Sequence, residues 1–241
     1  MPVDPIIDCV ELGRIDYRSA LKLQHRLVAA RLEGQLQHDL LLLLEHPPVF
    51  TLGRRGGKDH LCVTEAFLKQ KSVDLVHVER GGDITYHGPG QLVGYPIINL
   101  RRRKLTVTEY VTALETIMQK TAQDWGVELT RDDRNRGVWL GDSKMGSIGI
   151  ALRKGVTFHG FAFNVNLDLE PFQWINPCGL EGVGIARLKD HAQTTTPMDH
   201  VRKALKKHFS SVLNARLTSH DSDILGHYSS FNWRSYTAKI R

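Results

Sequence analysis

The sequence predicts an α+β fold, in which helices cover the faces of a mixed or antiparallel sheet. Helical and strand-like patterns follow one another in the order β, α, β, α, β, β, α, a β-rich stretch and a last α. This order is neither a strict βαβ repeat nor an all-β pattern. The 241 residues, of which 41% are hydrophobic and 24% charged, have the length and composition of one ordinary globular domain.

Caps and breakers mark the individual elements. Asp16 is a suitable N-cap for the first helix, and Pro47-Pro48 stops the first leucine-rich strand. Thr106 and Glu109 have the spacing of a capping box at the start of the long central helix. In chain order we expect helix 16–32, strand 40–45, helix 64–70, strands 73–78 and 92–100, helix 106–126, a β-rich stretch over 127–165 and helix 197–212.

Basic residues are concentrated late in the chain. The net charge is +6, and residues 201–241, with eight basic and two acidic side chains, account for the whole excess. A second basic cluster spans residues 101–104. Such patches suit nucleic acid, a membrane surface or an acidic protein, and a basic helix face that meets only solvent is an equally good interpretation.

The cysteines and the apolar runs indicate the compartment. Cys9, Cys62 and Cys178 form neither a disulfide framework nor a CxxC metal motif, so we expect free thiols in a reducing cytoplasm. A membrane span needs roughly 20 consecutive apolar residues, and the sequence has no such run. We expect neither a membrane span nor a secretory signal.

The segment 80–91, RGGDITYHGPGQ, is unusually rich in glycine. Glycines let backbone N–H groups approach a ligand and form a nest for an anion. The segment is neither a Walker loop nor a Rossmann fingerprint, because it lacks the Gly-Lys-Ser/Thr of the first and the following helix of the second. The alternative is a wide hairpin whose glycines only turn the chain.

Three further residues are candidates for chemistry. Lys144 stands among small residues and is either a proton acceptor or an exposed strand lysine. His159 lies in a strand pattern, where a lone histidine is more often structural. Cys178 lies in a Pro-Cys-Gly turn, whereas Cys9 fits a buried strand and Cys62 looks peripheral. A thiolate near a lysine ammonium has a lowered pKa and is a competent nucleophile.

Five motifs in this order carry a family resemblance. They are EHPPVFTLGR, RGGDITYHGPGQLVGYP, SKMGSIG, FHGFAFNV and NPCG. Together they resemble the octanoyltransferases of lipoate biosynthesis, the lipoyl(octanoyl) transferases, from about residue 6 to about residue 215. The resemblance implies the biotin/lipoate protein ligase-like α+β fold, with a large mixed sheet, a smaller sheet and flanking helices. We expect a catalytic domain over 1–217 and a basic, partly ordered tail over 218–241.

The resemblance also implies a reaction. An octanoyl group arrives as a thioester on the phosphopantetheine arm of acyl carrier protein. It passes to a cysteine, and then to the ε-amine of a lysine on a lipoyl domain. Such domains occur in 2-oxoacid dehydrogenases and in the glycine cleavage H protein. No cofactor, no metal, no nucleic acid and no membrane is implied, and the basic patches would dock the acidic carrier.

Residue roles follow from the matched motifs. Cys178 corresponds to the cysteine that carries the acyl thioester, and Lys144 to the lysine that lowers its pKa. Asp83 departs from many relatives, which carry glycine or an amide there. Small residues on the two strands suit a slot for an eight-carbon chain. The expected substrate-binding residues are Arg80, Gly81, Gly82, Asp83, Ile84, Thr85, Tyr86, His87, Ser147, Ile148, Gly149, Gly160, Phe161 and Ala162.

Two other classes of protein are alternatives for this sequence. A lipoate or biotin protein ligase shares the implied fold but activates a free acid with ATP, and it needs no nucleophilic cysteine. A non-catalytic module that binds nucleic acid through the basic tail would leave the glycine-rich segment unexplained.

Overall fold

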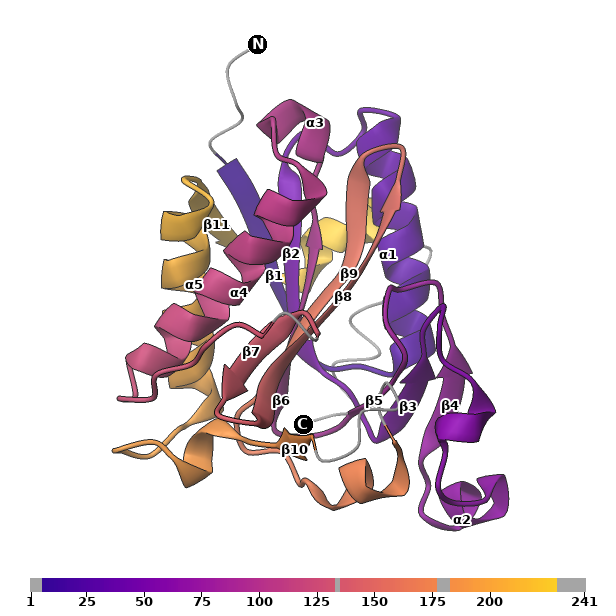
Figure 1. Ribbon diagram of the computed structural model, residues 1–241. Coiled ribbons are helices and arrows are strands. Elements are labelled where there is room, and N and C mark those ends of the chain that lie inside the picture. Colours follow the sequence, from indigo (N-terminus) through magenta and orange to yellow (C-terminus); the bar gives the residue numbers. More distant parts are fainter. Residues whose placement is uncertain (1–5, 133–134, 177–182, 229–241) are drawn as a thin grey trace.

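The computed structural model describes residues 6–132, 135–176 and 183–228, which form two sheets with helices on both faces of the larger one (Figure 1). The larger sheet has the strand order β10-β8-β9-β6-β2-β1-β11, with β7 paired to β8, and the smaller has the order β4-β3-β5. β1 is parallel to β2 and β11, whereas the pairs β2–β6, β6–β9 and β8–β9 are antiparallel. The expectation of a large mixed sheet and a smaller sheet is therefore confirmed.

The strands of the larger sheet are β1 (Ile6–Arg14), β2 (Asp39–Glu45), β6 (Gln91–Ile97), β7 (Gly137–Leu140), β8 (Ser143–Arg153), β9 (Val156–Asn164), β10 (Gly184–Ile185) and β11 (Arg216–His220). Those of the smaller sheet are β3 (Val49–Leu52), β4 (Asp74–His77) and β5 (Ile84–His87). The α-helices are α1 (Tyr17–Leu32), α2 (Glu65–Gln70), α3 (Leu100–Arg103), α4 (Val107–Gln123) and α5 (Met198–Val212).

The helices begin where the caps predict. Asp16 accepts a hydrogen bond from the Ser19 N–H at 2.9 Å at the start of α1, and the capping box of Thr106 and Glu109 is complete at the start of α4. α1 packs on one face of the larger sheet, and α4 and α5 pack on the other (Figure 1). Each face has its own apolar cluster, so the sheet is covered on both sides.

One expected strand ends earlier than predicted, and the expected domain boundary falls within a strand. The strand expected over 92–100 ends at Ile97, because the side chain of Asn99 accepts from the Arg102 N–H and caps the short helix α3. The expected boundary after residue 217 falls inside β11, whose residues pair with β1. The described chain then continues in a 3₁₀ turn, Ser222–Tyr228, while residues 229–241 of the expected tail lie outside the described residues.

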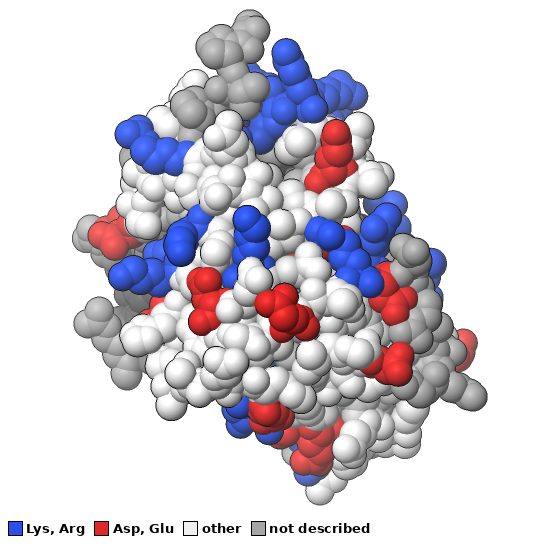
Figure 2. Space-filling model, turned by 60° about the vertical axis from the view of Figure 1, so that its left-hand side comes forward, with Lys and Arg blue, Asp and Glu red and all other residues white. Residues whose placement is uncertain are grey.

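The basic cluster 101–104 is only partly a surface feature. Arg103 is buried, and its Nε donates to Asp39 Oδ2 at 2.6 Å. Arg103 therefore neutralises a buried carboxylate and is not part of the basic surface expected to dock the acidic carrier. On α5, Lys206 donates to Glu11 of β1 at 2.6 Å, so part of that helix's charge is also compensated. On the face in Figure 2, basic side chains gather mainly in the upper half and acidic ones mainly in the lower.

Candidate functional site

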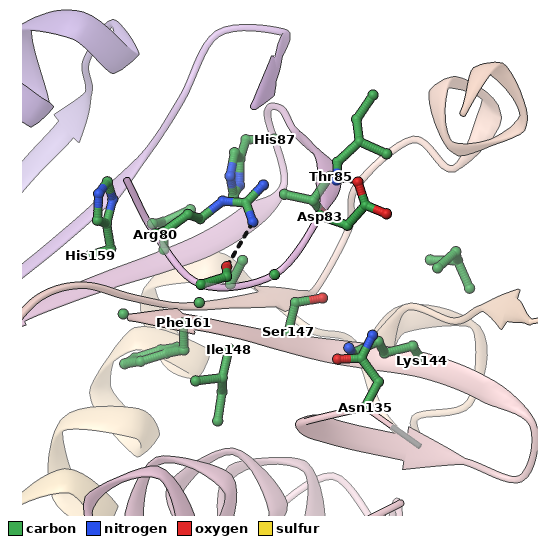
Figure 3. A pocket seen from close by; sticks show the side chains of 18 of the residues that line it. Arg80, Asp83, Thr85, His87, Asn135, Lys144, Ser147, Ile148, His159 and Phe161 are labelled. Atoms are coloured by element: carbon green, nitrogen blue, oxygen red, sulfur yellow. Dashed lines mark hydrogen bonds between the residues drawn. The ribbon is translucent and has the colours of Figure 1, made fainter. Parts of the chain in front are cut away.

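A cavity lies where the glycine-rich segment covers strands β6, β8 and β9 of the larger sheet (Figure 3). The space between its walls, open mouth included, is about 820 Å³. It is lined by Lys144 and by every expected substrate-binding residue except Tyr86, namely residues 80–85, 87, 147–149 and 160–162. Tyr86 instead packs against Phe50 and Phe172 in the apolar cluster of the smaller sheet.

The glycine-rich segment is a crossover between the two sheets and not a hairpin. Its strand β5 pairs with β3, whereas β6 pairs with β2 and β9. The Gly81 N–H donates to the carbonyl of Ile150 on β8 at 2.9 Å, which ties the segment to the floor of the cavity. Gly82 has φ of +88°, a backbone conformation that favours glycine. The hairpin interpretation is thus wrong, and the segment forms a wall of the cavity.

Arg80 is fixed by the smaller sheet. Its guanidinium is buried and donates to the Thr51 carbonyl at 2.7 Å, to the Thr51 hydroxyl at 2.8 Å and to the Gly81 carbonyl at 3.1 Å. Since several of its donors are already engaged, Arg80 positions the loop that carries it as well as lining the cavity.

A chain of hydrogen bonds continues from Thr51 through His87. Gln91 donates from Nε2 to Asn164 at 2.9 Å, so its Oε1 faces His87 Nδ1 at 2.7 Å. Nδ1 of His87 therefore carries a proton, and Nε2 is left to accept from the Thr51 hydroxyl at 3.4 Å. Burial holds the pKa of His87 well below its ordinary value, so the ring is neutral and its tautomer is fixed.

A second buried histidine is fixed in the same way. His46 Nδ1 lies 2.7 Å from the Ile15 carbonyl, which can only accept, so Nε2 of the neutral ring accepts from the Tyr95 hydroxyl at 2.7 Å.

Burial lowers the pKa of His46 to about 4 and raises that of Tyr17 to about 12. Tyr17 in turn contacts His159 Nδ1 at 3.3 Å. Among the described residues at this end of the cavity, the charged groups are Arg80 and Glu79, whose carboxylate lies 3.7 Å from His159 Nε2.

The stability of the fold should therefore decline in mild acid. Below the ordinary pKa of 6.5, the unfolded chain binds a proton at His46 that the folded chain binds only near pH 4. At pH 5 this loss is about 2 kcal/mol from His46 alone, and it reaches its limit below pH 4. Urea unfolding of the wild type and of His46→Gln at pH 8 and pH 5 measures the loss of stability that His46 causes. The variant should lose less stability than the wild type between the two pH values, and equal losses would contradict the assignment.

The two expected strand segments face each other across β8 and β9. Ser147 pairs with Ala162, Ile148 with Phe161, and Gly149 with Gly160. A Cβ on Gly149 would lie 3.0 Å from Arg80 Cδ and from the Gly81 carbonyl, and one on Gly160 would collide with the Gly94 carbonyl. These two glycines therefore let other parts of the chain approach the strands, so the space that they leave is already filled by the protein.

Lys144 lies at the other end of the cavity from Arg80 and His159 (Figure 3). It is 9% exposed, which excludes the interpretation as an exposed strand lysine. Its ammonium lies over the Trp139 ring, 5.2 Å from the centroid. A Cβ on Gly137 would lie 2.7 Å from Lys144 Cε, so that glycine leaves the path for the lysine side chain.

Cys178, expected to work with Lys144, lies outside the described residues. The described residues on either side of its segment are tied to the site. The Asn176 N–H donates to the His60 carbonyl at 2.8 Å, and the His60 ring contacts the Asp83 carboxylate. Val183 lines the cavity, and Ile185 of β10 pairs with Lys144.

Sequence reasoning missed several residues of the site. Tyr17, Thr51, Tyr95 and Trp139 either line the cavity or hold a residue that does. His46 lies in the first of the five motifs, which gave no role to any single residue. A polar side chain in an otherwise apolar strand or helix face, as at Thr51 and Tyr95, was the available signal.

Comparison with known proteins agrees with this architecture. Residues 16–210 match the lipoyl protein ligase A/B catalytic domain. The chain is 56% identical over 198 residues to an octanoyltransferase from Desulfotalea psychrophila, covering 81% of this chain and 89% of that protein. It is 45% identical to an octanoyltransferase from Caldicellulosiruptor bescii, covering 88% of this chain and 93% of the other.

Solved structures show the same fold at low identity. A bipartite lipoate protein ligase from Thermoplasma acidophilum superposes with a TM-score of 0.71 at 17% identity, covering 95% of this chain and 96% of the other. The biotin protein ligase from Aquifex aeolicus superposes with a TM-score of 0.53 at 13% identity, covering 97% and 76%.

Fold and matched region together define an enzyme of the lipoyl protein ligase A/B catalytic family. Within that family the chain belongs to the octanoyltransferases, which are acyltransferases. No helix in the described part of the chain is long and apolar enough to cross a membrane.

Proposed function

We propose that the protein transfers an octanoyl group from acyl carrier protein, through a thioester on Cys178, to the ε-amine of a lysine on a lipoyl domain. The observation that carries the proposal is Lys144, a lysine held in a cavity whose walls come from the family motifs. The proposal places the reaction in the cytoplasm, where the thiol stays reduced.

The other two cysteines are poor candidates for the nucleophile. Cys9 is 1% exposed in β1, and burial raises the pKa of its thiol to about 12, so it stays protonated at neutral pH. Cys62 is exposed and does not line the cavity. Cys178 is five residues before Val183, which does line it. This elimination supports Cys178 as the acyl carrier within the enzyme.

The cavity can supply the remaining chemistry. When the thiolate attacks a thioester, negative charge develops on the carbonyl oxygen, and an aimed N–H group stabilises it. The N–H groups of Gly81 and Ile84 are engaged by the Ile150 carbonyl and the Asp83 carboxylate. The Gly82 N–H has no hydrogen-bond partner among residues 6–132, 135–176 and 183–228, and it is our candidate donor. Lys144 takes up the proton of the Cys178 thiol and gives it to the departing phosphopantetheine thiolate. The neutral Lys144 amine can then accept a proton from the incoming amine as the amide forms and the Cys178 thiolate leaves.

The acceptor is assigned by analogy. The Thermoplasma acidophilum ligase is part of an archaeal lipoylation system, together with its E2 lipoyl domain. We extend this pairing to the lipoyl domains of 2-oxoacid dehydrogenases and of the glycine cleavage H protein as acceptors of the octanoyl group here.

Replacing Lys144 should raise the pKa of the Cys178 thiol. Two unit charges about 4 Å apart interact by roughly 4 kcal/mol at an effective dielectric constant near 20. A third of that energy moves a pKa by about one unit. In a Cys62→Ser background, the midpoint of Cys178 alkylation against pH should rise by about one unit in Lys144→Met. Lys203→Met, which alters an exposed lysine on α5, is the matched control. An unmoved midpoint would assign Lys144 another role, such as positioning the amine.

The proposed function is tested by its independence of nucleotide. A thioester is already an activated acyl group, so transfer from octanoyl-acyl carrier protein to an apo lipoyl domain should proceed in EDTA without ATP. Intact-mass spectrometry would detect the modified domain, and also the octanoyl-enzyme when the acceptor is left out. Modification from free octanoate and ATP, with none from the carrier, would instead identify an adenylating ligase.

A further inference from the structure

A second groove opens from the cavity and runs along β8. It shares part of its lining with the cavity, namely Gly81, Gly82, Asn135, Ile148 and Gly149. Beyond these shared residues the groove is lined by Val111 of α4 and Ile150 of β8, and by Arg55 and Arg136. The groove is thus a continuation of the proposed acyl site, with apolar side chains in its floor.

The two arginines are exposed and available to a ligand. Within the described parts of the chain, neither guanidinium has a hydrogen bond or an ion pair. Their backbones are nevertheless anchored. The Arg55 N–H donates to the Gly82 carbonyl at 3.1 Å, and the residue after Arg136, Gly137, donates to the buried carboxylate of Glu115 at 3.1 Å. The groove therefore combines a fixed apolar floor with two uncompensated positive charges.

We propose that this groove holds the phosphopantetheine arm of the acyl carrier protein, with Arg55 and Arg136 bound to its phosphodiester. The inference rests on the proposed function, since it places the donor of that reaction. The arm is long and flexible, carries apolar methyl and methylene groups, and has one phosphodiester between the carrier and the thioester. Guanidinium groups bind phosphate oxygens through two parallel charge-assisted hydrogen bonds.

Charge complementarity favours the donor arm over the acceptor. The acceptor brings a lysine, which has no phosphate and whose ammonium form two arginines would repel. The apolar floor formed by Val111, Ile148 and Ile150 also suits the pantetheine portion better than a charged side chain. Because the groove and the cavity share Gly82, an arm lying in the groove would present its thioester beside the candidate oxyanion donor.

The test compares donors that differ only in the phosphate. Octanoyl-pantetheine and octanoyl-phosphopantetheine are each supplied with an apo lipoyl domain, and kcat/KM is measured. The wild type should prefer the phosphorylated donor about tenfold, as expected for charge-assisted hydrogen bonds. In Arg55→Gln/Arg136→Gln the ratio of the two kcat/KM values should fall close to one. The double lysine variant, Arg55→Lys/Arg136→Lys, should keep part of the wild-type preference for the phosphorylated donor.

The experiment has a matched control variant and outcomes that would contradict the inference. Arg216→Gln removes an exposed arginine from β11, at the far edge of the sheet, and should keep the wild-type ratio. A double glutamine variant that keeps the wild-type ratio, or that changes only the KM for the lipoyl domain, would overturn the groove assignment alone. If neither these thioesters nor octanoyl-acyl carrier protein donates to the lipoyl domain, the proposed function is contradicted and this inference falls with it.

Discussion

A Cys178→Ser variant should lose octanoyl transfer by on the order of a thousandfold or more, as is usual when a catalytic nucleophile is removed. A serine hydroxyl is protonated at neutral pH, and a lysine ammonium nearby cannot ionise it as it ionises a thiol. The intact mass of the variant, mixed with octanoyl-acyl carrier protein, should show no added octanoyl group. In the wild type, peptide mapping should place the thioester on Cys178.

Two other cysteine variants serve as controls for this result. Cys62→Ser removes an exposed thiol outside the cavity lining and should transfer at the wild-type rate. Cys9→Ser alters a buried position in β1 and should change stability without changing the site of acylation. Transfer by Cys178→Ser at the original rate, or a thioester mapped to another cysteine, would remove Cys178 from the mechanism.

The largest loss of stability is expected from Asp39→Asn. Asp39 is 1% exposed and accepts from Arg103 Nε at 2.6 Å and from Arg31 Nε at 3.0 Å. Neutralising it leaves two buried guanidinium groups without their counter-charge. Removing one partner of a buried ion pair typically costs about 3–5 kcal/mol, a large part of the roughly 5–15 kcal/mol that stabilises an average domain.

The midpoint of urea unfolding measures this loss. Asp199→Asn is the matched control, because that carboxylate pairs with Arg202 while its side chain is 86% exposed. Exposed pairs contribute about 0–1 kcal/mol, so the control should unfold close to the wild type. Equal midpoints for the two variants would mean that the charges around Asp39 find other partners.

The parts of the fold that the sequence predicts are those set by local signals. α1 and α4 begin at their predicted caps, because a cap needs only a few neighbouring residues. The sequence does not predict β3 and β5, since each has four residues and its pairing partner is distant in sequence. The partners of Arg103 are also beyond local reasoning, because Asp39 lies 64 residues away.

In the candidate site, too, some features are predicted by the sequence and others are shown only by the fold. The motifs predict most of its lining, but they include Tyr86 because it lies between Thr85 and His87 in the sequence, although its side chain packs elsewhere. Gly149 and Gly160 suggest space for a ligand, whereas protein atoms occupy that space. A sequence shows that a side chain is small, but only the fold shows which atoms fill the space beside it.

The position of β1 between β2 and β11 has a consequence for folding during synthesis. Ile6 of β1 pairs with Arg216 of β11, so one edge of β1 has no partner until about 200 further residues have left the ribosome. Until then its N–H and C=O groups face solvent or other chains, which is the condition for intermolecular strand pairing. Contacts so distant in sequence also slow folding. The nascent chain should therefore depend on chaperones or on rapid completion to a greater degree than its size alone suggests.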